Sequence, residues 1–249
     1  MKFKIRKSKI LRNLFIAIGL LSLGNLISVY LIFNTAGVEA KVTRLLVKLL
    51  NVNLEANLPT YFSSLVLLAD AILLALIAYG NRAIGGRFWH WIGLSLIFVF
   101  ISLDEMIQIH EQLRAPMEAL FNTSGLLYFA WFIPYMAIVV ILGIAYFKFM
   151  MSLPKKILKL FILAGVVFVS GAVGMEMLGG LHAEVHGEDT LTYALMYSFE
   201  EFMEMSGGAI FFYALIVYIE MNFEKLRLRF KPKKKKKKIK KIKKNLIEA

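Results

Sequence analysis

The sequence contains no cysteine, which excludes disulfide bonds, thiolate metal ligands and cysteine nucleophiles. No serine–histidine arrangement names a reaction either. Basic residues are scarce inside the apolar runs of the second half of the chain: between 157 and 219 lysine occurs once, at Lys159, and arginine not at all. Acidic residues in these runs therefore have no basic neighbour in the sequence that could balance their charge.

Long apolar blocks dominate the chain. Of its 249 residues, 59% are hydrophobic, and the mean hydropathy is +0.66. A soluble domain is closer to half apolar, and blocks of about twenty apolar residues are long enough to cross a bilayer. The pattern predicts an all-α membrane bundle with six transmembrane helices in residues 13–220. The expected spans are 14–33, 61–79, 88–112, 126–149 (kinked at Pro134), 157–180 and 191–219.

The net charge of +13 comes mainly from the two tails, 1–12 and 221–249, which hold 20 of the 30 basic residues. Basic residues concentrate on the cytoplasmic side of membrane proteins, which predicts that both termini are cytoplasmic in a multi-pass protein of the cell (inner) membrane. Beside a final membrane helix, the polybasic tail is expected to bind anionic lipid headgroups rather than nucleic acid.

The first outer loop, 34–58, shows helical spacing of apolar and basic residues. Val42, Leu45 and Leu49 recur on one face, with Lys41 and Lys48 beside them. Two interpretations stay open: an amphipathic helix lying on the membrane surface, or an ordinary loop helix packed on the bundle.

Acidic residues and a histidine interrupt three of the spans. Each charged side chain inside a bilayer costs a few kcal/mol on insertion scales, and those that occur usually face the bundle interior and are functional. The predicted site residues are Asp104, Glu105, His110, Glu111, Glu176, Glu200, Glu201 and Glu204. On a continuous third helix, His110 would point away from the stripe that contains Asp104 and Glu111.

Several carboxylates in a low dielectric must be protonated, paired with cations or bound to metal. A carboxylate site with imidazole suits iron, manganese or zinc, so a divalent metal is the expected cofactor. The ferritin-like Glu-x-x-His template is not met, because His110 follows Glu105 by five residues. A protonated hydrogen-bond network, or acids lying in the headgroup region, are the alternatives.

Other polar residues are weaker candidates. His182 and His186 are expected in a short outer loop, where they could cap the site, and His90 is expected to be structural at the inner interface. Asp70, in the middle of the second span, either belongs to the same interior or bonds a neighbouring serine.

A family resemblance rests on several motifs: Leu103-Asp104-Glu105 with His110-Glu111, a glycine-rich helix with Glu176, Glu200-Glu201 with Glu204-Met205, and the stretch 57–64. The pattern resembles an uncharacterised family of six-span bacterial integral membrane proteins over most of residues 55–220. The resemblance implies the six-span topology and the importance of these acids, and it implies no reaction.

Three functions fit this pattern. The first is an intramembrane metalloprotein, in one form a metal-dependent enzyme that acts on a lipid or quinone. The second is a proton- or cation-coupled transporter or channel. The third is a structural or assembly subunit whose polar seam binds another membrane protein. The sequence leaves the oligomeric state open.

Overall fold

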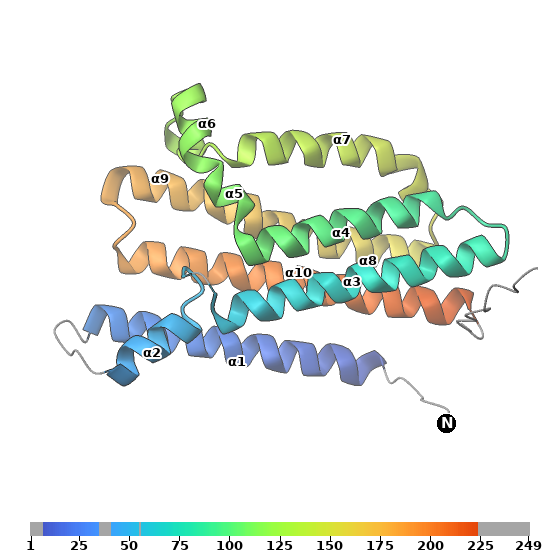
Figure 1. The fold of residues 1–249 in the computed structure, drawn as a ribbon, viewed down its shortest axis with the longest axis horizontal. Coiled ribbons are helices and arrows are strands. Elements are labelled where there is room, and N and C mark those ends of the chain that lie inside the picture. The colour runs from blue at the N-terminus through green and yellow to red at the C-terminus, as the bar shows by residue number, and fades with distance from the viewer. Residues whose placement is uncertain (1–6, 35–40, 55, 224–249) are drawn as a thin grey trace, which may run out of the picture.

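The computed structural model describes residues 7–34, 41–54 and 56–223, and within these ranges every regular element is helical. The elements in chain order are α1 (Lys7–Asn34), α2 (Lys41–Leu50), α3 (Leu58–Ala83), α4 (Trp89–Ile107), α5 (Ile109–Gln112), α6 (Arg114–Phe121), η1 (Gly125–Leu127), α7 (Phe132–Met151), α8 (Lys155–Val169), η2 (Ser170–Met175), α9 (Glu176–His186) and α10 (Leu191–Asn222) (Figure 1).

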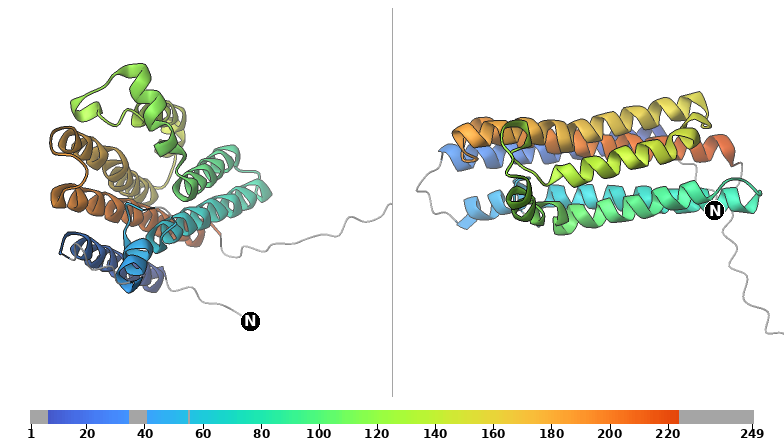
Figure 2. Two further views of the ribbon diagram at one scale, coloured as in Figure 1. Left: turned by 60° about the vertical axis from the view of Figure 1, so that its left-hand side comes forward. Right: turned by 90° about the horizontal axis from the view of Figure 1, so that it is seen from above.

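Six helical segments are long and apolar enough to cross a membrane: α1, α3, α4, α7, the run Lys155–His186, and α10. They lie lengthwise beside one another, as the views in Figures 1 and 2 agree. The predicted helical bundle with six possible membrane spans is confirmed by the length and apolar composition of these helices. Its predicted orientation in the membrane stays a prediction, and the tail segments 1–6 and 224–249 lie outside the described residues.

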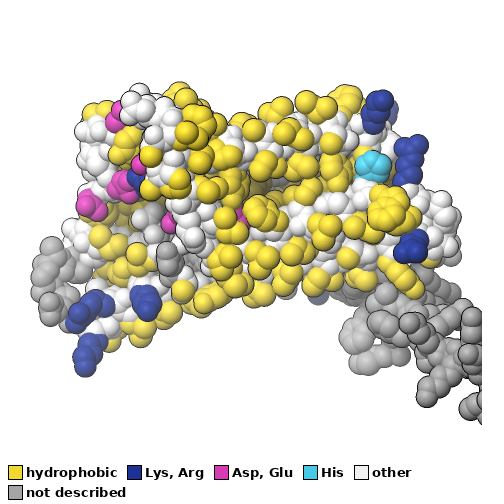
Figure 3. All heavy atoms as spheres, turned by 45° about the horizontal axis from the view of Figure 1, so that its top comes forward, with side chains coloured by type: hydrophobic (Ala, Val, Ile, Leu, Met, Phe, Trp, Pro, Cys, Tyr) yellow, Lys and Arg dark blue, Asp and Glu magenta, His cyan; other side chains and the backbone are white. Residues whose placement is uncertain are grey.

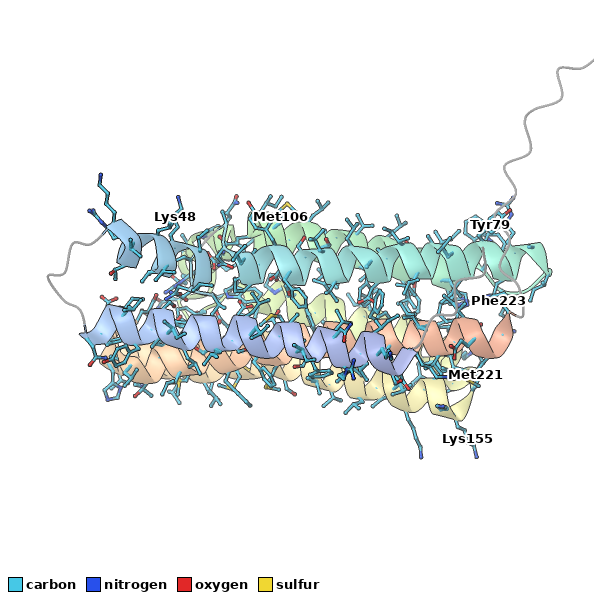
Figure 4. The ribbon with its side chains drawn as sticks, turned by 90° about the horizontal axis from the view of Figure 1, so that it is seen from below. Lys48, Tyr79, Met106, Lys155, Met221 and Phe223 are labelled. Carbon is cyan, nitrogen blue, oxygen red and sulfur yellow. The ribbon has the colours of Figure 1, made fainter. Side chains whose placement is uncertain are left out.

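The start of α1 and the end of α10 meet at one end of the bundle. Lys7 Nζ lies 2.5 Å from Glu220 Oε2, which joins the two helices there. We call this end the tail end, and the opposite end, which carries α2, α5 and α6, the site end. Figure 4 shows Lys48 at the site end, whereas Tyr79, Lys155 and Met221 lie at the tail end.

The last span, α10, is the centre of the bundle. It packs against α1, α3 and α8, and 61% of its most apolar stretch is buried, against 11% for α7. Small residues allow the closest approach: a Cβ atom at Gly207 would lie 2.8 Å from the backbone nitrogen of Phe168 on α8. Such contacts are typical of helix packing in membranes, where close backbone approach favours association.

Several predicted span boundaries are corrected by local geometry. The third span ends at Ile107 rather than near 112, because Gln108 adopts a left-handed conformation with φ 50° and ψ 52°. The fourth begins at Phe132, so Pro134 lies in the first turn of α7, where proline is tolerated. The fifth runs on to His186 and stops before Gly187, which has φ 80°.

The amphipathic segment of the first loop is helical, as predicted. α2 packs on α1, where Leu50 lies against Gly24, yet none of its residues is fully buried. Val42 and Leu45 are 67% and 55% exposed. The packing agrees with a loop helix on the bundle, while the uncovered apolar side chains agree with contact to the membrane surface, so both interpretations describe part of this helix.

The α8–α10 contact gives a stability prediction. Gly207→Ala should lower the unfolding free energy by about 1–3 kcal/mol, because the added methyl group meets the backbone of Phe168, which cannot move as a side chain could. Gly143→Ala on α7 is the control, since a Cβ there meets nothing within 4 Å. Thermal unfolding of both variants in detergent measures the effect; equal melting temperatures would contradict the close contact.

Candidate functional site

A cavity of about 370 Å³ lies near the site end of the bundle. All eight predicted site residues line it: Asp104, Glu105, His110, Glu111, Glu176, Glu200, Glu201 and Glu204. Most of them are neither fully buried nor open at the surface, because they face this internal space. The tertiary structure thus brings together acids that are about 100 residues apart in the sequence.

Four helical segments supply these residues. Asp104 and Glu105 lie near the end of α4, His110 and Glu111 lie on α5, Glu176 begins α9, and Glu200, Glu201 and Glu204 share α10. A single turn of π-helix, Ser170–Met175, comes directly before Glu176. Such turns insert an extra residue into a helix and so change which side chains face a given neighbour, and they occur frequently at functional sites.

The π-turn is also where the fifth span approaches α10 most closely at the site. A Cβ at Gly171 would lie 2.9 Å from the carbonyl oxygen of Glu200 and 3.2 Å from Cγ of Glu204. Only glycine fits here without displacing α10. The sequence shows that this span is rich in glycine, but nothing in it marked the π-turn.

The break at Gln108 decides where His110 lies. His110 donates its backbone N–H to Asp104 Oδ1 at 3.0 Å, and its Nδ1 lies 3.2 Å from Asp104 Oδ2. The hydroxyl of Tyr135 donates to the same carboxylate at 3.1 Å. The expectation that His110 points away from the acidic stripe is therefore wrong, because it assumed a continuous helix.

A second group of contacts surrounds Glu176. The indole N–H of Trp131 donates to Glu176 Oε1 at 2.8 Å, and the carboxyl groups of Glu176 and Glu200 are hydrogen-bonded to each other. A hydrogen bond between two carboxyl groups requires a proton on one of them, and two ionised carboxylates would repel each other. The contact therefore favours a proton or another cation between these two helices.

The remaining acids are crowded together. Glu201 interacts electrostatically with Glu105 and Glu176, and Glu204 with Glu105 and Glu201. Ser63 on α3 hydrogen-bonds to Glu105. Like charges that lie close together in a low dielectric repel strongly, so these glutamates favour the binding of any cation that enters the cavity.

Arg114 is the one arginine or lysine among the described residues that line the cavity. Its Nε lies 3.0 Å from Glu118 and its Nη2 2.5 Å from Glu188, both at the site end. The guanidinium carbon also lies 4.0 Å from the ring centre of Phe129. Its charge is thus already paired by two other acids, and no lysine or arginine among the described residues forms a salt bridge with Glu200, Glu201 or Glu204.

Across the described ranges, no group of three or more His, Cys, Asp or Glu side chains is arranged to hold a metal ion. The predicted metal ligands share a cavity, but they do not converge on one point. The carboxylate of Asp104 in particular already forms hydrogen-bond contacts with His110 and Tyr135.

The weaker candidates lie elsewhere. His182 and His186 are on α9, not in a loop; their rings stack with centroids 4.7 Å apart, and His182 hydrogen-bonds to Thr190. Asp70 is buried outside the cavity, and neither of its oxygens has a hydrogen-bond partner within the described chain, so the expected serine bond is absent there. His90 stacks on Phe149 near the tail end.

The aromatic wall of the cavity was not predicted from the sequence. Trp131, Tyr135, Tyr193 and Tyr197 all line it, and two of them donate to site carboxylates. Two pairs of polar aromatic residues in the sequence, Trp131 with Tyr135 and Tyr193 with Tyr197, could have indicated this wall. The members of each pair are four residues apart, which places them on one face of a helix.

Buried asparagines hold the 51–57 loop beside the cavity, and these too were missed. The side-chain amide of Asn25 donates to Ser198 at 2.7 Å, and its oxygen accepts from the backbone of Val52 at 3.1 Å. Asn57 accepts from Thr60 N at 2.7 Å and so caps α3, where Pro59 follows. The network fixes one wall of the site to α1 and α10.

Fold and cavity together define a helical protein of the membrane-spanning type with an acidic internal site. The chain belongs to the family described as "Domain of unknown function (DUF8692)", which matches residues 14–219. Neither a curated protein nor a solved structure matches it. The family covers all six spans, in agreement with the expected membership of an uncharacterised family.

The Asp104–His110 pair gives a titration prediction for metal-free protein. Burial alone would lower the pKa of His110, but the hydrogen bond and charge of Asp104, with Glu111 and Glu105 nearby, raise it above 6.5. Asp104→Asn should therefore lower this pKa, as read by NMR of the imidazole ring.

The same pair makes stability depend on pH. Because the folded-state pKa of His110 is raised, its contribution is complete below the unfolded pKa and is lost as the pH rises through the folded value. An His110 pKa that is unchanged in Asp104→Asn would show that the contact does not set the titration.

Proposed function

We propose that this chain is an integral membrane protein that binds a cation in its acidic cavity, with a divalent iron, manganese or zinc ion as the first candidate. One observation carries the proposal: carboxylates from α4, α9 and α10 line one cavity, while the arginine among its described lining residues is already paired. Carboxylates removed from bulk water require a cation or shared protons.

The Asp104–His110 contact supports a metal in particular. A histidine that binds metal nearly always donates its other ring N–H to a carboxylate or carbonyl group, which fixes the tautomer. With Nδ1 directed at Asp104, His110 has Nε2 available for an ion. Asp104 then orients the ligand instead of binding the metal itself.

Glu105 and Glu201 are the carboxylate ligands that we assign to the same ion. Both line the cavity and interact electrostatically with each other, and nitrogen with oxygen ligands suits the three metals named above. Because no three ligands are grouped around one point, binding has to draw these flexible side chains together. A bound ion would polarise a substrate oxygen, with a spare glutamate as general base.

The position of the cavity favours a substrate that arrives from the membrane or from the side that the site end faces. The distribution of basic residues predicts that this end faces outward from the cell. A lipid or quinone is the substrate class that such a position favours for an enzyme.

Metal content tests the proposal. Full-length protein purified from cells grown with iron, manganese and zinc should contain about one of these ions per chain. Glu105→Gln and Glu201→Gln should each weaken binding by at least about tenfold, because each removes an assigned ligand and loss of a group that merely supports a ligand already costs about 10–100-fold. Mass spectrometry of the metals in the purified protein measures this.

Glu220→Gln is the matched control, because it removes a carboxylate from the same helix as Glu201 but at the tail end, where it pairs with Lys7. It should keep the wild-type metal content. A metal-free wild type, or equal loss in the control, would remove the proposed metal site.

Proton- or cation-coupled transport is the second candidate, and the Glu176–Glu200 pair favours it. Two carboxyl groups that share a proton between neighbouring helices form a group that can take up and release a proton. The π-turn beside them is a segment where helix geometry can change at low cost.

Flux measurements separate this candidate from the first. In proteoliposomes, a proton gradient should drive cation uptake that falls at least tenfold in Glu176→Gln and in Glu204→Gln, because each loses an ionisable group at the site. Uptake that is unchanged in both variants, with Glu220→Gln again as control, would exclude coupled transport through this cavity.

A further inference from the structure

A second cavity of about 220 Å³ adjoins the acidic one, and its lining is entirely apolar or glycine. Phenylalanines form much of its wall: Phe98 from α4, Phe161 and Phe168 from α8, and Phe211 from α10. No charged or hydrogen-bonding side chain lines it among the described residues. Its walls come from five spans, α3, α4, α7, α8 and α10, and mostly from their middle parts, so it lies at the depth of the hydrocarbon.

The two cavities adjoin each other, since Ile101, Phe168 and Val169 line both of them. The helical repeat places acids at the junction: Glu105 follows Ile101 by four residues on α4, and Gly208 of the apolar cavity follows Glu204 by four residues on α10. A molecule in the apolar cavity would therefore have its end beside Glu105 and Glu204.

α7 covers both cavities loosely. It contributes Tyr135 and Val139 to the acidic cavity and Met150 to the apolar one, yet its own buried residues, Phe132 and Phe149, lie near its two ends. Figure 3 shows a recess on this face of the molecule, bordered by hydrophobic side chains, with acidic side chains toward its site end. The middle of α7 is thus the side from which a membrane molecule would reach the cavities.

We infer that the adjoining cavities bind a single-chain amphiphile with a protonated amine head. The chain occupies the apolar cavity, whose phenylalanine walls match hydrocarbon, and the amine pairs with Glu204 at the junction. Charge decides the head group, because the surplus of carboxylates at this position repels fatty acids and phosphate heads. This inference rests on the proposed cation-binding role of the acidic cavity and names the organic ligand that shares it.

Binding of radiolabelled hexadecylamine to full-length protein in detergent tests the inference. We expect saturable binding that unlabelled hexadecylamine displaces. Hexadecanoic acid, with the same chain and the opposite charge, and ethylamine, with the head alone, should compete at least tenfold less well. Equal competition by hexadecanoic acid would overturn the choice of head group, and displacement by ethylamine would overturn the role of the chain cavity.

Gly165→Leu tests the chain site directly. Gly165 lines the apolar cavity, and a Cβ there meets nothing within 4 Å, so a leucine fills the cavity without a steric clash at its Cβ. The variant should raise the Kd for hexadecylamine at least tenfold. Gly143→Leu is the control: its Cβ is equally unhindered, but it lies outside both cavities and should bind like the wild type.

Glu204→Gln tests the head site, and it should reduce the preference for hexadecylamine over hexadecanoic acid at least tenfold. Metal content measured on the same samples separates the two proposals. Normal metal content with no amine binding would overturn this inference alone, whereas amine binding by a metal-free protein would overturn the metal site alone. Wild-type amine binding by Gly165→Leu, in protein that elutes as one species with an unchanged melting temperature, would also overturn the inference.

Discussion

The repulsion among glutamates that line one internal cavity is the constraint on which the other features of this structure depend. Glu105, Glu176 and Glu201 come from three different helices, and little positive charge of the chain reaches them. Hydrogen bonds from Trp131 and Ser63 offset part of the cost. The rest has to come from protons or a bound cation, since a buried, unpaired carboxylate costs several kcal/mol.

The bundle meets this constraint with unusual local geometry. Two irregularities of the long described helices lie beside the cavity: the left-handed Gln108, and the π-turn before Glu176, which contains Gly171. The first brings His110 to Asp104, and the second places Gly171 against α10 beside Glu200. The tail half of the bundle, packed around Trp91 and Phe211, shows no such breaks within its described spans. The helix breaks and the acidic cavity thus lie in the site half of the described bundle, whereas regular helices surround the apolar cavity.

The acidic and apolar cavities lie among unevenly packed spans. α10 is the most buried span because it packs against α1, α3 and α8, while α7 touches the bundle mainly near its ends and leaves the space below its middle open. Gly165 leaves that space free of a side chain, and Gly207 lets the backbones of α8 and α10 approach each other. A bundle built for stability alone would have filled this volume, since protein interiors are otherwise close-packed.

The sequence by itself determined the helical class and the six apolar spans and singled out the acids that line the cavity, because hydropathy and the scarcity of charge in a bilayer are local properties of the chain. It could not determine how those acids are arranged. The position of His110 depends on a helix break at Gln108, a residue type that rarely adopts a left-handed conformation. The contact of Glu176 with Glu200, and the apolar cavity beside the acidic one, exist only where distant helices meet. These contacts depend on packing between helices, which the periodicity of a single helix does not encode.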